Sequence, residues 1–177
     1  ATVALHHHQR WDGAGWPEMS KLTRGRYAGG LSGRRTHVFA RIVAAANIFD
    51  NLTAGADGKQ VRPAIFALHT MQSERFVDRF DPVVLDAFLR YLPPFPTGVE
   101  VMLSDGRPAA VTQMNPDQPC RPKVRPLDDE SEGEDIDLTE RPELLIRRSQ
   151  GTDVKRWLYE LPSRQQVQAA AAMESVV

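Results

Sequence analysis

The sequence predicts a mainly α-helical chain that continues into a small antiparallel β appendage and ends in further helices. Apolar residues recur at helical spacing in the first half, and alternating segments flank an Asp-Gly turn in the second half. A proline-rich stretch between the two halves stops the last helix of the first half. We therefore predict three regions: a helical domain over residues 1–95, a β-rich appendage over residues 96–147, and C-terminal helices with a tail over residues 148–177.

The composition is that of an ordinary globular protein and argues against nucleic acid polymers and membranes as partners. The chain has 177 residues, enough for one sizeable core, and a net charge of −1, which predicts no general attraction to nucleic acid polymers. No apolar run approaches the roughly 20 residues needed to span a bilayer, so we expect no membrane contact in this part. The single cysteine, Cys120, excludes an internal disulfide and is compatible with a reducing cytoplasm, our predicted location.

Three segments of the first region carry helix signals. Residues 36–52 carry the strongest one, because apolar side chains recur there every three or four positions. A second helix is expected over residues 61–76, with a proline tolerated near its start. The third is expected over residues 82–92, where Asp81 is the N-cap and Pro82 lies in the first turn.

The second region has the pattern of a β-hairpin. Residues 98–103 and 109–114 alternate in hydrophobicity on either side of the turn signal Asp105-Gly106. Residues 123–127 have the composition of a third short strand. This region is therefore expected to form a small antiparallel sheet.

The last third of the chain starts with an acidic block. Residues 128–137 hold seven acidic residues among ten, which predicts a solvated loop, with cation binding as the less favoured alternative. A final strand is expected over residues 144–147. Short helices are expected over residues 153–161 and 163–173.

The most informative stretch is a histidine-rich turn close to the first residue. It reads His7-His8-Gln9-Arg10-Trp11, followed by Asp12-Gly13-Ala14-Gly15-Trp16-Pro17. Histidine is the commonest metal ligand, and two consecutive histidines on a helix end point roughly 100° apart, so they can serve neighbouring metal ions. Taken alone, adjacent histidines are more often surface residues, and residues of a purification tag are another interpretation that the Asp-Gly-x-Gly-Trp-Pro continuation disfavours.

The turn residues have expected structural roles. Asp12 is expected to cap and brace the turn, and Gly13 and Gly15 allow its backbone angles, with Pro17 closing it. His37 and His69 lie on expected helices outside this stretch, and we interpret them as ordinary core or surface histidines. Cys120 lies in a proline-rich turn and is not expected to act as a nucleophile.

This stretch resembles the signature of the HD-GYP family, bacterial metal-dependent phosphodiesterases that hydrolyse cyclic di-GMP in signal transduction. The family pattern is His-His-Glu, two residues, then Asp-Gly-x-Gly-Tyr-Pro, so Gln9 stands for glutamate and Trp16 for tyrosine. Residues 40–53 resemble the family's Ala-Arg-Ile…Ala-Asp-x-Phe-Asp-Ala-Leu-Thr helix. Pro-x-Gly, Asp-Gly-Arg and Arg-Pro-x-Val motifs follow at residues 96–98, 105–107 and 121–124. The resemblance extends to about residue 127, loosely to 146, and identifies residues 1–95 as the C-terminal part of a helical HD-superfamily domain.

The resemblance implies ligands for a cluster of iron or manganese ions. His7 and His8 match family metal ligands, whereas Asn47 replaces an aspartate ligand and offers an uncharged amide that bridges two cations poorly. Asp50 matches a second aspartate that is generally structural. Gln9 retains an acceptor oxygen but lacks the charge that would support a histidine ligand.

The resemblance also implies contacts with the substrate. Trp16 stacks on a guanine or covers the local core, and both interpretations stay open. Arg62 matches a family residue that holds a substrate phosphate, while Ile65 stands where the family's Arg-Pro-x-Lys run has its lysine. Arg41 is expected in a structural ion pair, with phosphate binding as the alternative.

The implied function is hydrolysis of cyclic di-GMP by a metal-bound hydroxide in a longer parent protein, giving the linear dinucleotide or GMP. The family's His-Asp pair lies before the His-His motif, so the chain alone is expected to be inactive. The alternative is a degenerate module that interacts with protein partners or senses the nucleotide, with a helical domain lacking nucleotide chemistry as a third hypothesis. A homodimer is compatible with each of them.

Overall fold

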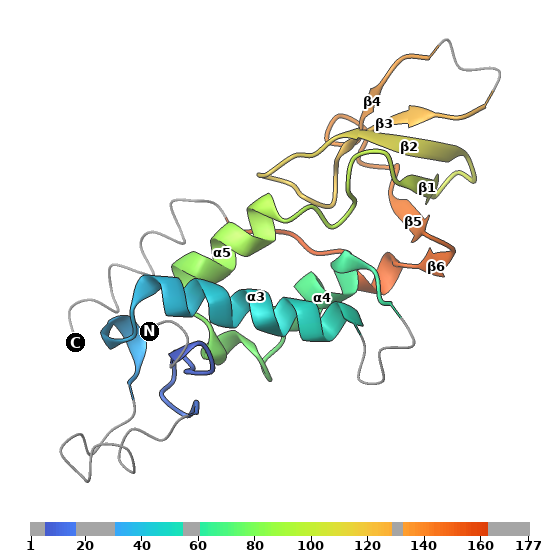
Figure 1. Ribbon diagram of the computed structural model, residues 1–177. Coiled ribbons are helices and arrows are strands. Elements are labelled where there is room, and N and C mark those ends of the chain that lie inside the picture. Colours follow the sequence, from blue (N-terminus) through green and yellow to red (C-terminus); the bar gives the residue numbers. More distant parts are fainter. Residues whose placement is uncertain (1–5, 17–30, 55–60, 129–132, 163–177) are drawn as a thin grey trace, which may run out of the picture.

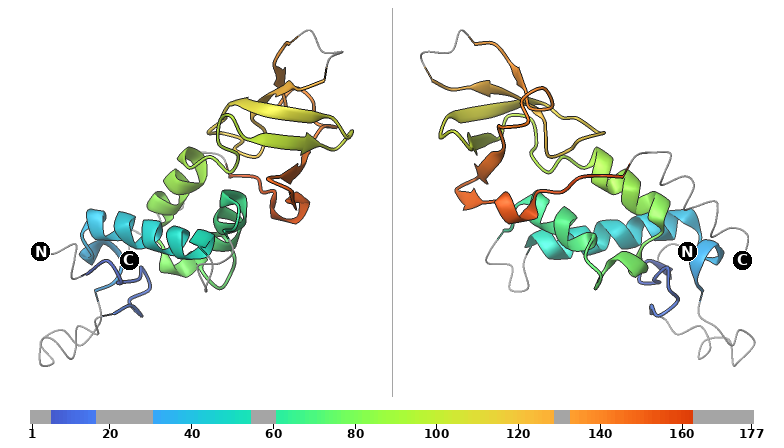
Figure 2. Two further views of the ribbon diagram at one scale, coloured as in Figure 1. Left: turned by 45° about the vertical axis from the view of Figure 1, so that its right-hand side comes forward. Right: turned by 180° about the vertical axis from the view of Figure 1, so that it is seen from behind.

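The computed structural model describes residues 6–16, 31–54, 61–128 and 133–162 (Figure 1). The α-helices are α3 (Val38–Ala54), α4 (Ala64–Met71) and α5 (Pro82–Tyr91). The strands are β1 (Glu100–Leu103), β2 (Pro108–Gln113), β3 (Lys123–Pro126), β4 (Ile136–Asp137), β5 (Ile146–Ser149) and β6 (Thr152–Asp153). Short 3-10 helices are η1 (Gly33–Arg35), η2 (Val77–Arg79) and η3 (Lys155–Trp157). The α-helices gather at one end of the molecule and the strands at the other (Figure 2).

The helices pack around small residues of α3. Ala40 and Ala45 are fully buried, and α3 contacts both α4 and α5 through this side. The core between them consists of Ala45, Leu68, Met71, Phe80, Val84, Leu85 and Leu89. The predicted helix over residues 36–52 is confirmed, with a start and an end that each lie two residues later.

The second predicted helix is shorter than expected. Helix α4 begins at Ala64, because Pro63 before it has an extended backbone. It ends at Met71, and the hydroxyls of Thr70 and Ser73 donate there to the carbonyls of Phe66 and Thr70. The prediction of helix as far as residue 76 is therefore wrong.

Helix α5 begins as the sequence predicts. A side-chain oxygen of Asp81 accepts a hydrogen bond from the Val83 N–H at 2.8 Å, and Pro82 occupies the first turn. These two residues fix the direction in which α5 leaves the site described below.

The strands form one antiparallel sheet in the order β4-β3-β2-β1-β5-β6. The expected hairpin is confirmed, since β1 pairs with β2 across the Asp105-Gly106 turn, and β3 is the expected third strand. One face of the sheet buries Val101, Leu103, Ala109, Val111, Val124 and Ile146 together with Phe95. The alternation of buried and exposed residues along β1 to β3 is what made these strands recognisable.

The prediction of a mainly α-helical chain with helices at the C-terminus is wrong. The described residues contain three α-helices and a six-stranded sheet, so the fold mixes α and β structure. Residues 153–161, expected to be helical, contribute the end of β6 and only the single turn η3. Gln150 and Gly151 both have positive φ (49° and 77°) and form the two-residue turn of a hairpin between β5 and β6. The helix expected over residues 163–173 lies outside the described residues.

Part of the acidic block is also more ordered than predicted. Ile136–Asp137 forms β4 against β3, and Asp135 accepts hydrogen bonds from Thr112 and Arg125, each at 2.8 Å. These partners hold the pKa of the Asp135 carboxyl below its usual value. The prediction of a solvated loop is therefore wrong for Ile136–Asp137, while residues 133–135 are exposed and lie outside the strand. Residues 129–132 lie outside the described part.

The sheet contacts the helices through residues of α4 and of the segment that follows β6. Ile65 of α4 is fully buried in the core of the sheet. Tyr159 packs against both cores, and its hydroxyl donates to the Leu89 carbonyl of α5 at 3.2 Å. No helix of the described residues is long and apolar enough to cross a bilayer.

Candidate functional site

The histidine-rich stretch folds into a tight turn held by its own backbone. The Gln9 N–H donates to the His6 carbonyl at 2.9 Å, and the Trp16 N–H donates to the His8 carbonyl at 3.1 Å. The second of these bonds brings the end of the stretch back onto its start. A Cβ at Gly15 would lie 2.4 Å from the Arg10 nitrogen and 2.5 Å from the His8 carbonyl oxygen. Only glycine fits this close backbone approach.

Three of the predicted site residues come together on this turn. The His7 and His8 ring centroids lie 4.0 Å apart with the rings tilted by 42°, and Trp16 meets His8 edge to face at 6.3 Å. His8 is exposed, and 66% of Trp16 is exposed. Because so much of the indole faces solvent, a ring of a ligand has room to stack on it.

Asp12 and Gly13 shape the turn below the histidines. An Asp12 oxygen accepts from the Ala14 N–H at 3.0 Å, and the same carboxylate pairs with Arg10. Gly13 has a φ of 81°, which favours glycine. Gln9, which stands where the family has glutamate, is 4% exposed and lines a narrow space together with Trp11 and Ala44.

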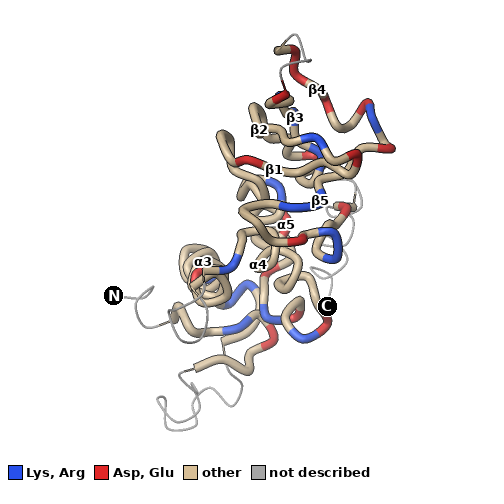
Figure 3. Tube along the Cα trace, turned by 90° about the vertical axis from the view of Figure 1, so that its right-hand side faces the viewer, with Lys and Arg blue, Asp and Glu red and all other residues tan. Residues whose placement is uncertain are grey.

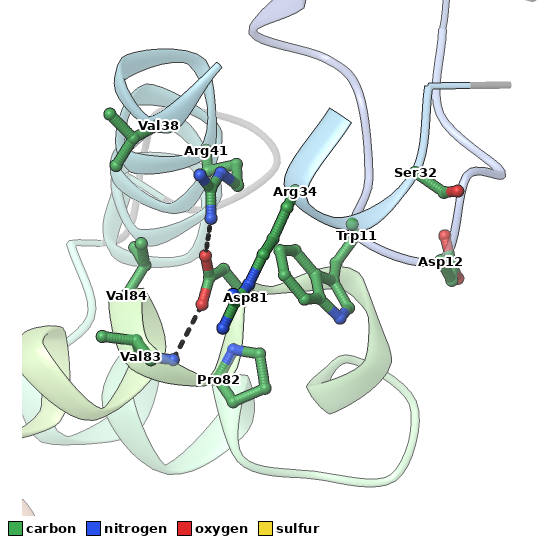
Figure 4. A pocket seen from close by; sticks show the side chains of 11 residues that line it. Trp11, Asp12, Ser32, Arg34, Val38, Arg41, Asp81, Pro82, Val83 and Val84 are labelled. Carbon is green, nitrogen blue, oxygen red and sulfur yellow. Dashed lines mark hydrogen bonds and ion pairs between the residues drawn. The ribbon is translucent and has the colours of Figure 1, made fainter. Parts of the chain in front are cut away.

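An ion pair ties this turn to two helices. Arg41 of α3 pairs with Asp81, the N-cap of α5, and the Arg41 guanidinium lies 5.6 Å from the centroid of the Trp11 ring (Figure 4). The Trp11 N–H donates to the Arg79 carbonyl at 2.9 Å. Arg41 and Asp81 line a cavity of about 820 Å³ beside Trp11. The carboxylate partner supports the structural alternative for Arg41.

The other predicted site residues are distributed along α3 and just beyond it. Ala44 lines a narrow space beside Gln9, and Asn47 lies three residues further along, so both occupy the same side of the helix. Asp50 is exposed on α3. Arg62 lies at the far end of α3, where its N–H donates to the Thr53 carbonyl at 2.8 Å, and it is not among the residues gathered at the histidine turn. Pro17 lies outside the described residues.

The donor set of the described residues is incomplete for a metal cluster. Paired imidazoles suit a divalent transition metal. However, no group of three His, Cys, Asp or Glu side chains within the described residues is placed to hold an ion. The remaining ligands of such a cluster would have to come from other residues.

The remaining histidines and the cysteine have structural surroundings. His37 is exposed, and its ring nitrogen accepts from the Phe39 N–H at 3.2 Å, while His69 is half-buried in α4. Burial raises the pKa of the Cys120 thiol to about 11, so the thiol stays protonated near neutral pH. A thiol with a raised pKa is a poor nucleophile, which argues against a nucleophilic role for Cys120.

Sequence reasoning missed a group of residues at the contact between helices and sheet. Arg62 lies against Phe66, Phe66 against Trp157, and Trp157 against Arg156. Phe66 and Trp157, the pair that joins the two segments, stand 91 positions apart in the sequence, and no local pattern links them. The only available signal was the sequence Lys155-Arg156-Trp157, in which basic and aromatic residues adjoin.

Two protein families match the chain. Residues 1–84 match the family described as HD domain, and residues 100–152 match the family described as KOW domain associated with HD domain. The first match contains the histidine turn and α3, α4 and the start of α5, and the second contains most of the sheet.

Curated proteins similar to this chain include three from bacteria. A cyclic di-GMP phosphodiesterase of Pseudomonas aeruginosa is 29% identical over 123 residues, which cover 70% of this chain and 27% of that protein. The cyclic di-GMP phosphodiesterase response regulator RpfG of Xanthomonas campestris pv. campestris is 37% identical over 90 residues. A cyclic di-GMP phosphodiesterase of Thermotoga maritima is 32% identical over 90 residues. The last two matches each cover 51% of this chain and 21% of the relative, so the chain spans about a quarter of the length of these proteins.

Proposed function

The chain carries an HD-GYP-like domain of the HD superfamily, and we propose that it contributes to the metal-dependent hydrolysis of cyclic di-GMP. The observation that carries the proposal is the turn on which His7, His8 and the exposed ring of Trp16 lie together. The names of the three relatives support the choice of substrate.

In this proposal His7 and His8 are metal ligands, and Asn47 is a weak neutral donor on the same side of α3 as Ala44. Iron or manganese suits a site that includes imidazole. A divalent metal bound there supplies an activated water and neutralises the charge of the scissile phosphate. Further ligands must come from residues beyond those described, so the activity belongs to a longer protein of the size of the relatives.

The surrounding residues position the substrate in this proposal. Trp16 offers its exposed face for stacking on a guanine, and the N–H groups of Arg62 bind a phosphate oxygen. The Arg41–Asp81 pair keeps the histidine turn against α3 and α5, which fixes where Trp16 projects. The exposed apolar side chains Phe39, Ile42 and Val43 on α3 leave a surface against which another part of such a protein can pack.

The test replaces each histidine in the protein at its natural length. His7→Ala and His8→Ala are expected to reduce the rate of cyclic di-GMP hydrolysis at least about 100-fold, because each removes a metal ligand. His37→Ala is the matched control, since this exposed histidine lies outside the turn. Rates in manganese-containing buffer, followed by chromatography of the products, measure the effect. Equal rates for His7→Ala and His37→Ala would rule out the assigned role of the histidine pair.

A further inference from the structure

The position where the resemblance places a substrate-binding lysine is closed to the ligand. Ile65 occupies it, is fully buried, and packs into the core of the sheet beside Phe95 and Val101. A lysine there would have to bury its ammonium group among apolar residues. The contact with the sheet therefore excludes a lysine at position 65, one helical turn after Arg62.

The same contact brings another cation to the surface near Arg62. The Arg62 guanidinium carbon lies 4.6 Å from the centroid of the Phe66 ring, and Phe66 meets Trp157 edge to face at 5.2 Å. The Arg156 guanidinium carbon lies 4.8 Å from the centroid of the Trp157 ring. Two arginines, one just before α4 and one from η3, thus flank a pair of touching rings.

The charge of these arginines is not balanced locally. Arg62 and Arg156 are exposed, and neither forms an ion pair with another residue in the described part of the chain. The nearest acid in sequence, Asp153, instead accepts from the Lys155 N–H at 3.0 Å and lies 3.9 Å from Arg147. The label β5 in Figure 3 lies beside basic residues drawn in blue, and the sequence of this strand includes Arg147 and Arg148. Lys155 and Arg156 of η3 therefore add two cations to those of β5, while the acids Asp153 and Glu160 flank η3 in the sequence.

The arrangement suits a phosphate better than a stacked base. Each ring already has a guanidinium group against it, so the rings hold the arginines rather than offer a free platform. A stacked guanidinium is restricted in its rotation and keeps its N–H groups available for an anion. Guanidinium forks bind phosphate oxygens through paired, charge-assisted hydrogen bonds.

We propose that Arg156, held on Trp157, binds a phosphate of the same cyclic dinucleotide that Arg62 contacts, so that the sheet-bearing part of the chain supplies the cation missing at Ile65. A cyclic dinucleotide has two phosphodiester groups, so one of them can be held by Arg62 and Arg156 while the scissile one would lie at the metal site. The inference rests on the proposed function, since it concerns the same ligand. It makes the segment after β6 part of the substrate site.

Binding of cyclic di-GMP to the protein at its natural length tests this assignment. Titration calorimetry in the presence of a chelator prevents hydrolysis and measures the affinity of the wild type and of Arg62→Ala, Arg156→Ala and Lys155→Ala. Lys155 is the matched control, because it is the exposed basic neighbour of Arg156 and does not stack on a ring in the described structure. Arg156→Ala is expected to weaken binding about tenfold, as for the loss of a charged hydrogen bond, and Lys155→Ala by less than about twofold. Arg156→Lys, which retains the charge without the fork, is expected to fall between them.

The outcomes separate this inference from the function on which it rests. If the wild type binds and Arg62→Ala weakens binding while Arg156→Ala behaves like Lys155→Ala, the role of Arg156 is refuted and the proposed function stands. If the wild type neither binds cyclic di-GMP with the chelator nor hydrolyses it with manganese, the proposed substrate is wrong and the role of Arg156 falls with it. Melting temperatures of the variants identify any loss of folding, which is not expected for an exposed arginine.

Discussion

At the scale of single residues, glycine decides the geometry of the histidine turn. The backbone of Gly15 lies against that of Arg10 and His8, and the Trp16 N–H to His8 carbonyl bond depends on this approach. The position of Trp16 relative to the histidines therefore follows from the absence of one side chain. The glycine spacing was visible in the sequence, but the distance between the two backbone segments was not.

Replacement of Gly15 by alanine is predicted to reduce cyclic di-GMP hydrolysis about 10- to 100-fold, because small displacements of site residues have effects of this size. The Cβ would meet backbone atoms at 2.4 to 2.6 Å, so the turn must open. Gly98→Ala is the control: a Cβ at Gly98 meets no atom within 4 Å, and its positive φ costs about 1 kcal/mol far from the turn. Initial rates under saturating substrate compare the two variants. Unchanged hydrolysis by Gly15→Ala would show that the turn geometry is irrelevant to activity.

Residues whose roles depend on sequence neighbours could be predicted, whereas residues whose partners are distant in the sequence could not. Asp81 was predicted as an N-cap because Asp followed by Pro is a local signal. Its second partner, Arg41, lies 40 positions away and could be predicted only as one of two alternatives. Arg156 was not predicted at all, because its role depends on a ring from another part of the chain.

At the scale of elements, Asp81 joins the start of α5 to α3 and to the histidine turn. Its carboxylate caps α5 and pairs with Arg41, and both side chains are largely buried, with 6% and 18% exposed. Removal of one partner from a buried ion pair costs more than from a surface pair, because the other charge is left buried without a partner.

Asp81→Ala is predicted to lower the free energy of unfolding by about 2–4 kcal/mol, since it removes the cap and leaves Arg41 without its partner. Asp81→Asn retains an acceptor for the Val83 N–H and is predicted to cost less. Asp78→Ala is the control, because Asp78 is exposed on η2, and a change there is expected to stay within about 0.5 kcal/mol. Urea unfolding measures all three. A loss for Asp81→Ala no greater than that for Asp78→Ala would contradict the assigned role of the pair.

The elements with strong local signals were the ones that sequence analysis placed correctly. Helices α3 and α5 have periodic apolar residues or a cap, and β1 and β2 alternate around an Asp-Gly turn. A strand was expected over residues 144–147, and β5 (Ile146–Ser149) overlaps it with a start and an end that each lie two residues later. Strand β6 was not predicted, because its two residues follow a Gln-Gly turn and show no alternation. The pairing of β5 depends on β1, which lies more than 40 residues earlier.

At the scale of the whole molecule, a buried arginine links the helices to the sheet-bearing part. Arg90 of α5 is 3% exposed and donates to Asp86 at 2.9 Å and to the Pro162 carbonyl at 2.6 Å. Its guanidinium also lies 3.5 Å from Asp117, in the connection between β2 and β3. Together with Ile65 and Tyr159, Arg90 fixes the place of η3 beside α4, on which the proposed role of Arg156 depends.

This contact between helices and sheet could not be predicted from the sequence. The Pro162 carbonyl is 72 positions from Arg90, and Ile65 looked only like a departure from a substrate-binding pattern. The structure gives that departure a physical reason, because the side chain at position 65 packs inside the sheet. The packing of α4 against the sheet-bearing part therefore has two effects on the proposed site. It excludes a lysine at position 65, and it brings Arg156 close to Arg62.

The most direct test of the account is hydrolysis of cyclic di-GMP by the protein at its natural length, with manganese, with ferrous iron and with a chelator. The account predicts that the linear dinucleotide or GMP accumulates with a metal and not with the chelator. It further predicts that Asn47→Asp accelerates the reaction about tenfold, because a carboxylate neutralises the metal ions better than an amide. Absence of product with either metal, in the wild type and in Asn47→Asp, would contradict the account.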